Sequence, residues 1–454
     1  MTHAPSRVRR EDPRRTSSPS AGQTGTSGHR SSRHRYTVLR LLLVTFFGLA
    51  IAALTPGVAS AAGEQVRGTL TTGATGPIAG VTITVETPDG QEVGEGETDE
   101  RGRFSVPVPG PGEYVVTLDT DSLPENVTVG GAGDTRTVTV EPNGREPVNF
   151  GLSDGQRGSG SDRILAVQLF VDGLRFGLLI AISAVGLSLI FGTTGLTNFA
   201  HGELVTIGAI VAFYLNVDAD IPLLGAAVIA VVIGGLVGAL NELALWRPLR
   251  RRGTGLVAAL VVSIGLSLAV RYLIQTVYGG RSNPYEDYQS QRARDYGAFA
   301  LTDRDLYSII ISLVVLVAVA LMLQRTRIGK AMRAVADNRD LAASSGIDVN
   351  RVILIVWVMG GALAALGGVL LGLSDQIQWD MGFRLLLLMF AGVTLGGLGT
   401  AYGALVGSII VGVFVQMSTL VIRDDVKYVG GLLLLILILV VRPQGILGSR
   451  SRVG

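Results

Sequence analysis

Apolar and polar positions divide the chain into two unlike parts. Residues 1–162 are polar or moderately apolar, whereas residues 163–446 form successive apolar runs. These runs have about 17–25 residues, the length that crosses the hydrocarbon core of a bilayer. They predict transmembrane helices over residues 164–191, 200–215, 222–245, 256–278, 306–323, 351–373, 384–398, 401–422 and 428–441. Residues 384–422 alternatively form one bent helix or a re-entrant pair.

Short runs in residues 64–152 alternate apolar and polar side chains between Gly, Pro and Asp turns, a pattern that predicts antiparallel strands. The predicted strands are Val66–Leu70, Val81–Val85, Phe104–Val108, Tyr114–Leu118 and Thr135–Val140. Asp99 and Gly102 suit a hairpin turn, and Phe104 and Tyr114 would supply core aromatic rings. The predicted fold is therefore a polytopic all-α membrane bundle of about eight or nine spans, preceded by an exported β-sandwich.

The N-terminal residues predict export of this β-sandwich. Residues 1–38 are rich in Arg, Ser, Gly and Pro without apolar periodicity, which predicts a disordered basic cytoplasmic tail. Residues 39–62 join an apolar core to the small residues Ala59-Ser60-Ala61, and predict either a cleaved signal peptide or an uncleaved anchor helix. The sandwich then spans residues 63–152, a linker residues 153–162, and the membrane domain residues 163–448. The chain has no cysteine, so the sandwich cannot rely on disulfides.

The distribution of charge predicts orientation, whereas the net charge of +2 does not. Loops at residues 246–252 and 325–351 are basic, as is the tail after Val441, and the positive-inside rule places them in the cytoplasm. Loops at 216–220 and 374–384 are acidic or nearly neutral. We therefore expect a multi-pass plasma-membrane protein with residues 63–162 on the extracytoplasmic side.

The motif content argues against an enzyme. The P-loop pattern Gly-x-x-x-x-Gly-Lys-Ser/Thr is absent, since the one Gly-Lys pair, Gly329-Lys330, is followed by alanine. Three of the four histidines lie in the N-terminal tail. We predict no catalytic residue, no metal site, no cofactor and no nucleic-acid partner. A protein that moves solutes against a gradient would need an energy source from elsewhere.

A polar break between the first two predicted spans is the first candidate site. It contains Asn198, Phe199, His201 and Glu203, with Gly195 and Gly202 permitting non-helical backbone. Broken backbone at membrane depth is tolerated where it is packed in protein or faces water. The break is therefore either an element of a transport pathway or a structural network that satisfies loose backbone ends.

The basic segment Arg325–Arg351, between two apolar runs, is the second candidate site. Residues 327–341 are rich in helix formers, and Gly346 is a natural end for a short helix. A cytoplasmic helix and turn held between two membrane helices has the form of a docking element for a soluble partner. The alternative is an ordinary amphipathic loop.

Three motifs in order resemble the LivH type of branched-chain amino acid ABC transporter permeases. They are Ala184–Leu204, Arg327–Asn338 with Ala342–Asp348, and Arg442–Gly448. The resemblance implies an importer in which two such permeases pair, cytoplasmic ABC ATPases drive them, and an extracytoplasmic solute-binding protein delivers the substrate. Asp340–Gly346 then matches the coupling pattern Glu-Ala-Ala-x-x-x-Gly, with Asp for Glu and Leu341 for the first Ala. The implied ATPase-coupling residues are Gly329, Arg333, Asp340, Ala342 and Gly346.

The N-terminal strands carry a second resemblance. Gly76–Thr82, Thr98–Phe104 and Gly110–Tyr114 are similar to carboxypeptidase regulatory-like domains. Such a domain either contacts a surface-bound partner, such as the solute-binding protein, or acts as a passive spacer.

Other transport functions stay open. The resemblance implies branched-chain amino acids as substrates, but some relatives with the same permease pattern carry urea or short amides. A secondary transporter or channel with an exported adhesion or sensor domain is a further alternative. Ion coupling needs ionisable groups inside the bundle. The ionisable groups in or beside the predicted spans lie near the span ends, which argues against ion coupling. They are Asp172, Glu203, Glu242 and Arg271.

Overall fold

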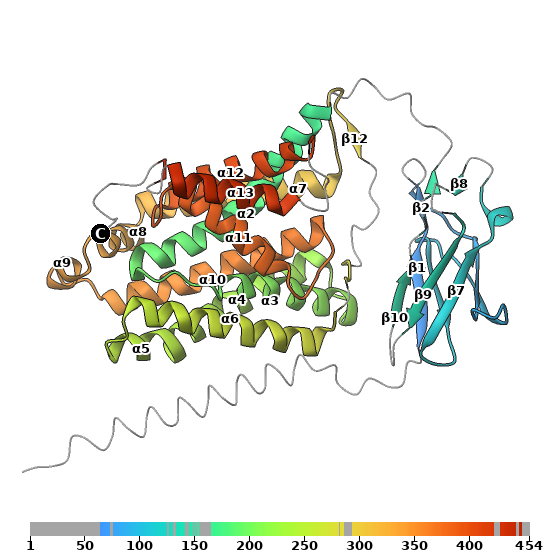
Figure 1. The fold of residues 1–454 in the computed structure, drawn as a ribbon, viewed down its shortest axis with the longest axis horizontal. Helices are drawn as coiled ribbons and strands as arrows, with labels where there is room; N and C mark the ends of the chain where they lie inside the picture. Colours follow the sequence, from blue (N-terminus) through green and yellow to red (C-terminus); the bar gives the residue numbers. More distant parts are fainter. Residues whose placement is uncertain are drawn as a thin grey trace, which may run out of the picture. The chain divides into compact units, whose positions relative to one another are not determined.

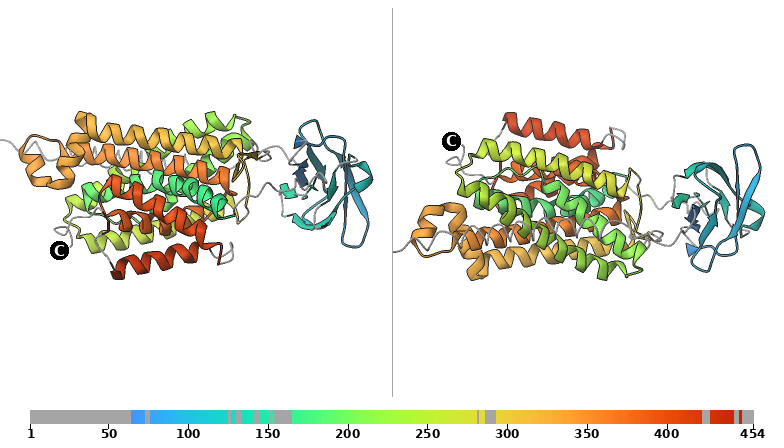
Figure 2. Two further views of the ribbon diagram at one scale, coloured as in Figure 1. Left: turned by 90° about the horizontal axis from the view of Figure 1, so that it is seen from above. Right: turned by 90° about the horizontal axis from the view of Figure 1, so that it is seen from below.

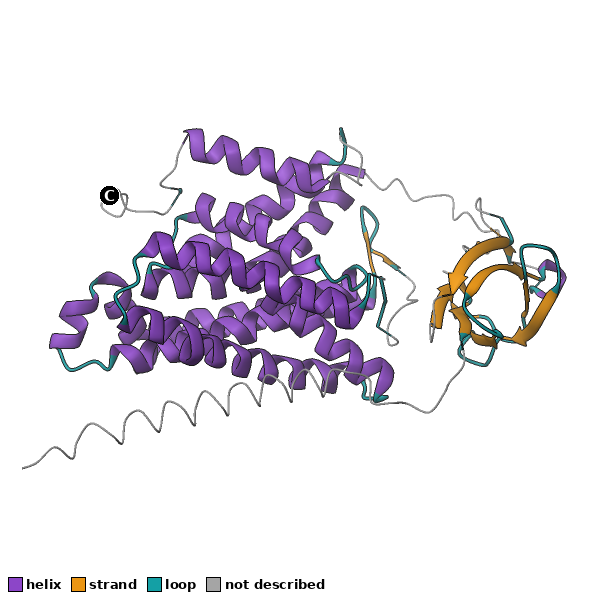
Figure 3. Cartoon of the chain, turned by 60° about the horizontal axis from the view of Figure 1, so that its bottom comes forward, coloured by secondary structure: helices purple, strands orange, loops and turns teal. Residues whose placement is uncertain are grey.

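The computed structural model contains a part built of strands and a part built of helices, each with its own hydrophobic core (Figures 1 and 3). It describes residues 64–72, 76–124, 127–129, 133–140, 145–148, 150, 152–153, 165–280, 282–285, 293–421, 427–441 and 445–446. The predicted N-terminal tail, the signal or anchor segment and nearly all of the linker lie outside these residues.

The strands form two main sheets. A four-stranded antiparallel sheet has the order β5-β4-β7-β9, and a three-stranded sheet has the order β10-β1-β6, in which β1 is parallel to β10 and antiparallel to β6. The strands are β1 Gln65–Thr69, β2 Thr71–Thr72, β3 Gly76–Pro77, β4 Thr82–Glu86, β5 Glu92–Glu97, β6 Arg103–Pro107, β7 Gly112–Leu118, β8 Thr128–Val129, β9 Thr135–Val140, β10 Arg145–Val148 and β11 Leu152–Ser153. All five predicted strands are confirmed.

Alternate residues of both sheets point into one core. Val66, Ile83, Val106 and Val116 are among its buried members, and each lies on a different strand. The predicted core rings of Phe104 and Tyr114 are also buried there. Alternation of this kind follows from the two-residue period of a strand, which turns every second side chain to the same face.

A turn is present at Asp99 and Gly102 as predicted, but it is not a hairpin, because the strands on either side of it, β5 and β6, belong to different sheets. Gly102 has a φ of 72°, a left-handed conformation that glycine adopts without steric cost, and its N–H donates to Asp99 O at 2.7 Å. Asp99 Oδ1 accepts hydrogen bonds from the backbone N–H groups of Arg101, at 2.9 Å, and Arg103, at 2.8 Å. The turn joins β5 to β6 and so links the two sheets.

The helical part follows the predicted apolar runs. Its helices are α2 Leu165–Thr194, α3 His201–Phe213, α4 Leu223–Asn241, α5 Arg247–Arg251, α6 Leu256–Tyr278, α7 Asp303–Arg325, α8 Arg327–Asp337, α9 Arg339–Ser344, α10 Val349–Ser374, α11 Met381–Gly396, α12 Ala401–Ser418 and α13 Lys427–Val441. Short π-helical turns, Tyr214–Asp218 and Glu242–Trp246, continue α3 and α4. A small strand pair, β12 Arg294–Asp295 and β13 Ala300–Leu301, precedes α7.

Six helices in the described part of the chain are long and apolar enough to cross a membrane: α2, α4 with its continuation to Arg251, α6, α7, α10 and α12. Both α11 and α13 are apolar but shorter, and α3 has 13 residues. The protein is therefore a multi-pass membrane protein, and the count of eight or nine spans stays a prediction.

Residues 384–418 form two helices, α11 and α12, in place of the single bent helix that was one alternative for residues 384–422. Helices α11 and α12 are antiparallel, because Gly392 meets Gly407 while Gly396 meets Gly403. Side chains at these positions would overlap the facing backbone, so glycine permits the close approach of the pair. A turn at residues 397–400 joins them.

Helices α2 and α10 lie in the centre of the bundle, and α6 and α7 lie at its surface (Figure 2). The centre is packed through small residues; Gly234 of α4 and Gly361 of α10, for example, bring their backbones into contact. Helices α5, α8 and α9, which carry much of the arginine, lie at the same end of the bundle (Figure 1). The two basic loops therefore face the same side, as their charge predicts.

Candidate functional site

Residues 195–200 interrupt the helical backbone between α2 and α3. Gly195 has a φ of 70°, and its N–H donates to Phe191 O at 2.7 Å, which closes the end of α2. Ordered but non-helical backbone then continues until α3 begins at His201. The predicted polar break is thus present at the predicted place.

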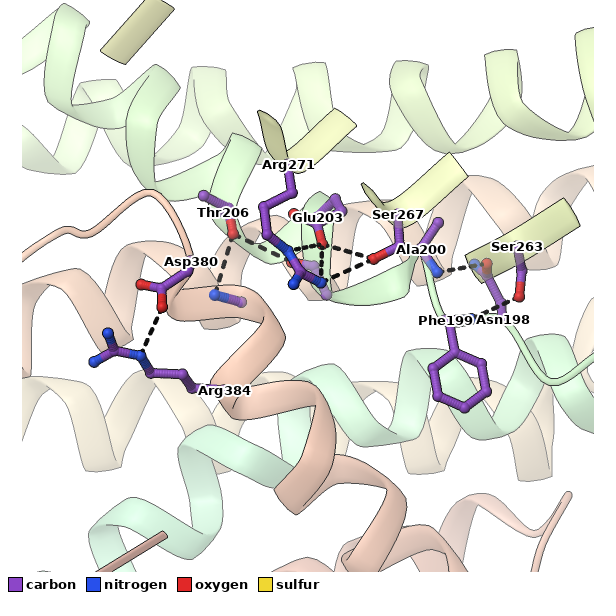
Figure 4. A network of polar contacts seen from close by, with 12 residues as sticks. Asn198, Phe199, Ala200, Glu203, Thr206, Ser263, Ser267, Arg271, Asp380 and Arg384 are labelled. Carbon is purple, nitrogen blue, oxygen red and sulfur yellow. Dashed lines mark hydrogen bonds and ion pairs between the residues drawn. The ribbon is translucent and has the colours of Figure 1, made fainter. Parts of the chain in front are cut away.

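Polar side chains satisfy the loose backbone groups of this break (Figure 4). Asn198 Oδ1 accepts a hydrogen bond from Ala200 N at 3.1 Å, and Asn198 O accepts one from His201 N at 3.3 Å. Ser263 Oγ, from α6, accepts one from Phe199 N at 3.2 Å. An unsatisfied backbone group inside a bilayer costs several kcal/mol, so Asn198 and Ser263 have a clear structural role here.

His201 ties α3 to α2. Its Nε2 donates to the carbonyl oxygen of Ser183 at 3.1 Å, and the whole side chain is buried. Nδ1 has no hydrogen-bond partner within the described part of the chain. This geometry is compatible with the structural interpretation of His201, because a buried donor with a fixed carbonyl partner anchors a helix.

Glu203 forms a buried ion pair with Arg271 (Figure 4). Glu203 Oε1 accepts from Ser267 Oγ at 2.9 Å and from Arg271 Nε and Nη2 at 3.3 and 3.2 Å. The two residues are only 1% and 8% exposed. The guanidinium carbon of Arg271 also lies 3.6 Å from the ring centroid of Phe383 on α11, a cation–π contact. Three helices therefore meet at one pair of charges.

This pair corrects one sequence expectation. Arg271 lies inside α6, seven residues before the helix ends at Tyr278, and Glu203 is turned toward it. Glu203 is the third residue of α3, near a span end as predicted, but both side chains are buried, so the bundle does hold ionisable groups in its interior. A signal was present in the sequence: Ser263, Ser267 and Arg271 recur every four residues in an otherwise apolar helix, which places them on one face.

Aromatic rings continue the site along α11. Phe199 packs against Phe390 with ring centroids 4.9 Å apart. Phe383 and Phe390 are seven residues apart, so they lie on one side of α11 two turns from each other. Asn198, Phe199, His201 and Glu203 are thus brought together in one region. Their partners include Arg271, which was expected only as an ionisable group near a span end, and Ser267 and Phe383, which were not expected at all.

The basic segment forms two short helices. Gly329 is buried in α8, where a side chain would overlap the backbone of Met322 and Leu323 at the end of α7. Its N–H donates to Thr326 Oγ1 at 3.0 Å, which caps α8. Arg333, four residues further along α8, is exposed. Gly329 therefore lets α8 turn tightly against the membrane helix before it.

Helix α9 has defined ends. Asn338 Oδ1 accepts from Leu341 N at 3.0 Å at the start. At its end Gly346 has a φ of 85°, and two hydrogen bonds form a Schellman motif: Gly346 N to Ala343 O at 3.0 Å and Ile347 N to Ala342 O at 3.1 Å. A side chain at Gly346 would meet no atom within 4 Å, so space does not demand glycine here. The left-handed backbone is what favours glycine at this position.

The side chains of α9 divide between the bundle and solvent. Ala342 is 4% exposed, whereas Leu341 is 65% exposed beside the exposed Asp340. A single exposed leucine is common on protein surfaces and is not by itself evidence of an interface. Helices α8 and α9 lie at one end of the bundle, away from α3, so the two candidate sites are separate (Figure 1).

Comparison with known proteins places the helical part in a family. Residues 169–441 match the family model described as "Branched-chain amino acid transport system / permease component". The chain belongs to this permease family. The match covers more than half of the chain, runs from α2 to α13, and leaves strands β1 to β11 outside it. The protein is thus a permease component of a transport system and not an enzyme.

Individual relatives agree with the family. The LivH permease protein of the high-affinity branched-chain amino acid transport system of Salmonella typhimurium is 30% identical over 295 residues, which cover 62% of this chain and 95% of LivH. Its Escherichia coli K12 counterpart is 30% identical over 296 residues, with the same coverage. The ribose import permease protein RbsC of Escherichia coli K12 is 27% identical over 242 residues, 51% of this chain and 72% of RbsC.

Among solved structures, PsaBC from Streptococcus pneumoniae in complex with Fab aligns with 60% of this chain and 91% of that chain. The TM-score is 0.36 and the sequence identity 11%, a similarity too low to inform the fold.

Proposed function

We propose that this permease is the membrane subunit of an ATP-driven ABC importer for branched-chain amino acids. It forms the pathway with a second homologous permease, cytoplasmic ABC ATPases drive it through residues 327–350, and an extracytoplasmic solute-binding protein delivers the substrate. The family match and the printed function of the LivH relatives support the substrate class. The sequence has no P-loop, so in the proposed importer ATP is hydrolysed by partner subunits.

The geometry of α8 and α9 carries the proposal. Gly329, Met332 and Val335 bury one face of α8 against the bundle, where α8 contacts α2, α7 and α10. The following helix, α9, is capped at both ends and presents Leu341 to solvent. A capped helix is a rigid knob, so a force applied at Leu341 by a closing ATPase would pass through α8 to three membrane helices.

The end of the bundle that carries α5, α8 and α9 also indicates how the protein is oriented in the membrane. Glu242, which is fully buried, pairs with Arg250 of α5 and holds this arginine-rich helix against the end of α4. The positive-inside rule makes this end cytoplasmic, together with α8 and α9. Residues 63–162 are then extracytoplasmic, and we propose that their strands form a β-sandwich of the carboxypeptidase regulatory-like type.

The polar break lies beside the proposed pathway. Non-helical backbone and a charge pair inside a membrane bundle are both costly, and both occur where α3, α6 and α11 meet. Transport proteins keep such features where a solute passes. We therefore propose that Phe199 and Glu203 line the route, while Asn198 and His201 hold the backbone around it.

The substitution Gly346→Asp tests the coupling assignment. An aspartate would strain the left-handed backbone at the end of α9 and add charge to the docking surface, so ATP-dependent leucine uptake should be lost while membrane insertion is retained. Gly297→Asp is the matched control: Gly297 lies in the turn between β12 and β13, has a φ of 82°, and likewise has no atom within 4 Å of an added side chain.

Uptake at the wild-type rate in Gly346→Asp would refute the coupling role. Affinity purification of the wild-type chain from its native membranes provides the second arm, with ATPases identified by mass spectrometry. Purification without any ATPase, together with leucine uptake that survives ATP depletion, would refute the importer proposal itself.

A further inference from the structure

Helix α6 contacts α3 through polar groups at Ser267 and Arg271 and through an edge-on ring contact between Tyr278 and Phe213. Its buried residues are Ala259, Ser263, Ser267, Arg271 and Tyr278, and the rest of its surface exposes large apolar side chains. Ser263 bonds the backbone at Thr197 and Phe199, and Ser267 and Arg271 bond Glu203. Hydrogen bonds of this kind can be exchanged for bonds to a polar solute, whereas apolar contacts cannot.

The charges of Glu203 and Arg271 exceed what the fold requires. Ser263 and Asn198 already satisfy the broken backbone, and α3 and α6 make their own internal hydrogen bonds. Removing two charges from water is expensive even when they are paired, and a well-packed apolar pair is often as stable. A stabilising role therefore gives a poor account of why this pair is kept in a membrane interior.

The carboxylate of Glu203 is also used unevenly. Its Oε1 accepts three hydrogen bonds, whereas its buried Oε2 has no partner in the described part of the chain. A buried network that exists for stability satisfies all of its members. One open carboxylate oxygen next to a guanidinium is an arrangement that can accept a further donor.

We propose that Glu203 and Arg271 form a subsite for the α-ammonium and α-carboxylate groups of an amino acid in transit. This proposal rests on the proposed function and names the residues that bind its substrate. When α6 parts from α3, the substrate carboxylate accepts hydrogen bonds from Arg271 and its ammonium donates to Glu203. Two ion pairs then replace one, and no charge is left unpaired in the membrane, because both the residue pair and the zwitterion are neutral overall.

The neighbouring aromatic rings complete the subsite. Phe383 lies under the guanidinium of Arg271, and Phe390 lies two turns along α11 against Phe199. Together these rings give apolar surface on the side of α11 that faces the charge pair. A zwitterionic headgroup bound by the charges would leave its branched apolar side chain against these rings, a chemistry that suits leucine, isoleucine and valine.

Direct binding to the purified full-length chain tests the subsite. The probes are L-leucine, leucinamide, which lacks the carboxylate, and 4-methylpentanoate, which lacks the ammonium group. Trp379 is the reporter, since it stacks on Tyr272, the residue next to Arg271, with ring centroids 6.4 Å apart. The other two tryptophans, Trp246 and Trp357, stack on each other, and Trp379→Phe assigns the signal.

We expect leucine to change Trp379 emission saturably and each analogue to bind at least about tenfold more weakly. Arg271→Gln should abolish the preference for leucine over leucinamide, and Glu203→Gln the preference over 4-methylpentanoate. Equal responses of the wild-type chain to leucine and both analogues, or no response to leucine at any concentration, would overturn the proposal.

The double variant Glu203→Gln/Arg271→Gln separates recognition from folding. Each single variant leaves one charge buried without its partner and can lose stability for that reason alone. The double variant removes both charges, so thermal stability should return toward that of the wild type, whereas leucine binding and uptake should stay lost. Recovery of leucine binding in the double variant would show that the pair is only structural.

The two proposals fail in different ways. Leucine binding through Glu203 and Arg271 in a chain that recruits no ATPase would refute the importer and leave the subsite. ATP-driven leucine uptake that is unchanged in the double variant would refute the subsite and leave the importer.

Discussion

Gly202 on α3 and Gly382 on α11 bring two helix backbones into direct contact, because a side chain on either residue would overlap the carbonyl oxygen of the other. Across the same contact Thr206 Oγ1 accepts a hydrogen bond from Gly382 N at 3.1 Å. Gly202 immediately precedes Glu203 in the chain. The glycine pair therefore fixes the position from which Glu203 reaches Arg271.

We predict that Gly202→Ala destabilises the purified protein by about 1–3 kcal/mol, the usual effect of adding a methyl group to a packed contact. The measurement is thermal unfolding in detergent. Gly265→Ala is the control, since Gly265 is an exposed position of α6 with no atom within 4 Å of an added side chain, and alanine favours a helix over glycine. A variant at Gly202 as stable as the control would contradict the packing argument.

Sequence patterns located most elements because those elements depend on local chemistry. Apolar runs marked the helices, and two-residue alternation marked five strands. Strand β5, Glu92–Glu97, was not predicted because its sequence is rich in Glu and Gly and lacks apolar alternation. It lies at the edge of its sheet, where pairing to β4 holds it without a large apolar face.

The candidate site was only half predictable for a different reason. Asn198, His201 and Glu203 are close in sequence and lie at a visible break in an apolar run. Their partners come from other helices: Arg271 is 68 positions from Glu203, and Ser183 is 18 positions from His201. Which face of α6 turns toward α3 depends on the packing of the whole bundle, and local propensity does not contain that information.

Leu341 gives a prediction for the docking surface. The side chain of Leu341 is largely exposed, and only its backbone N–H takes part in the cap of α9, by donating to Asn338 Oδ1. Leu341→Asn keeps that N–H and should therefore leave the helix and membrane insertion unchanged. Loss of a buried apolar contact with the ATPase should weaken their association by at least about tenfold. Leu341→Met, which keeps an apolar side chain, is the control in a quantitative co-purification. Undiminished association of the Asn variant would remove Leu341 from the interface.

Asp99 gives a pH dependence in the strand part. Burial alone raises the pKa of Asp99, but backbone hydrogen bonds from Arg103 and Arg101 and the charge of Arg103 together outweigh it and hold the pKa below its ordinary value of 3.8. Because the folded-state pKa is the lower one, the carboxylate stabilises the turn above pH 3.8, and this stabilisation is lost as the pH falls through the lowered pKa.

Hydrogen exchange of the Arg101 and Arg103 amides, corrected for the intrinsic effect of pH, measures this dependence. In the wild-type chain, protection of these amides should decrease as the pH is lowered below 3.8, the ordinary pKa of aspartate. Asp99→Asn should reduce the protection already at neutral pH. Glu100→Gln, at the neighbouring exposed residue, is the control and should behave as the wild type. Protection in Asp99→Asn equal to that of the control at neutral pH would show that the carboxylate does not hold the turn.

Removal of residues 64–153 tests whether the strand part is needed for transport. Its core and the core of the bundle share no residue, and the family match begins only at residue 169. A chain that keeps residues 1–63 and replaces the strands with a Gly/Ser linker should therefore insert, retain its ATPases and take up leucine at about the wild-type rate, because every contact of the bundle core is retained. The measurement is uptake of labelled leucine, normalised to the amount of chain in the membrane. Correct insertion and ATPase association without uptake would instead make the strand part a required contact for the solute-binding protein.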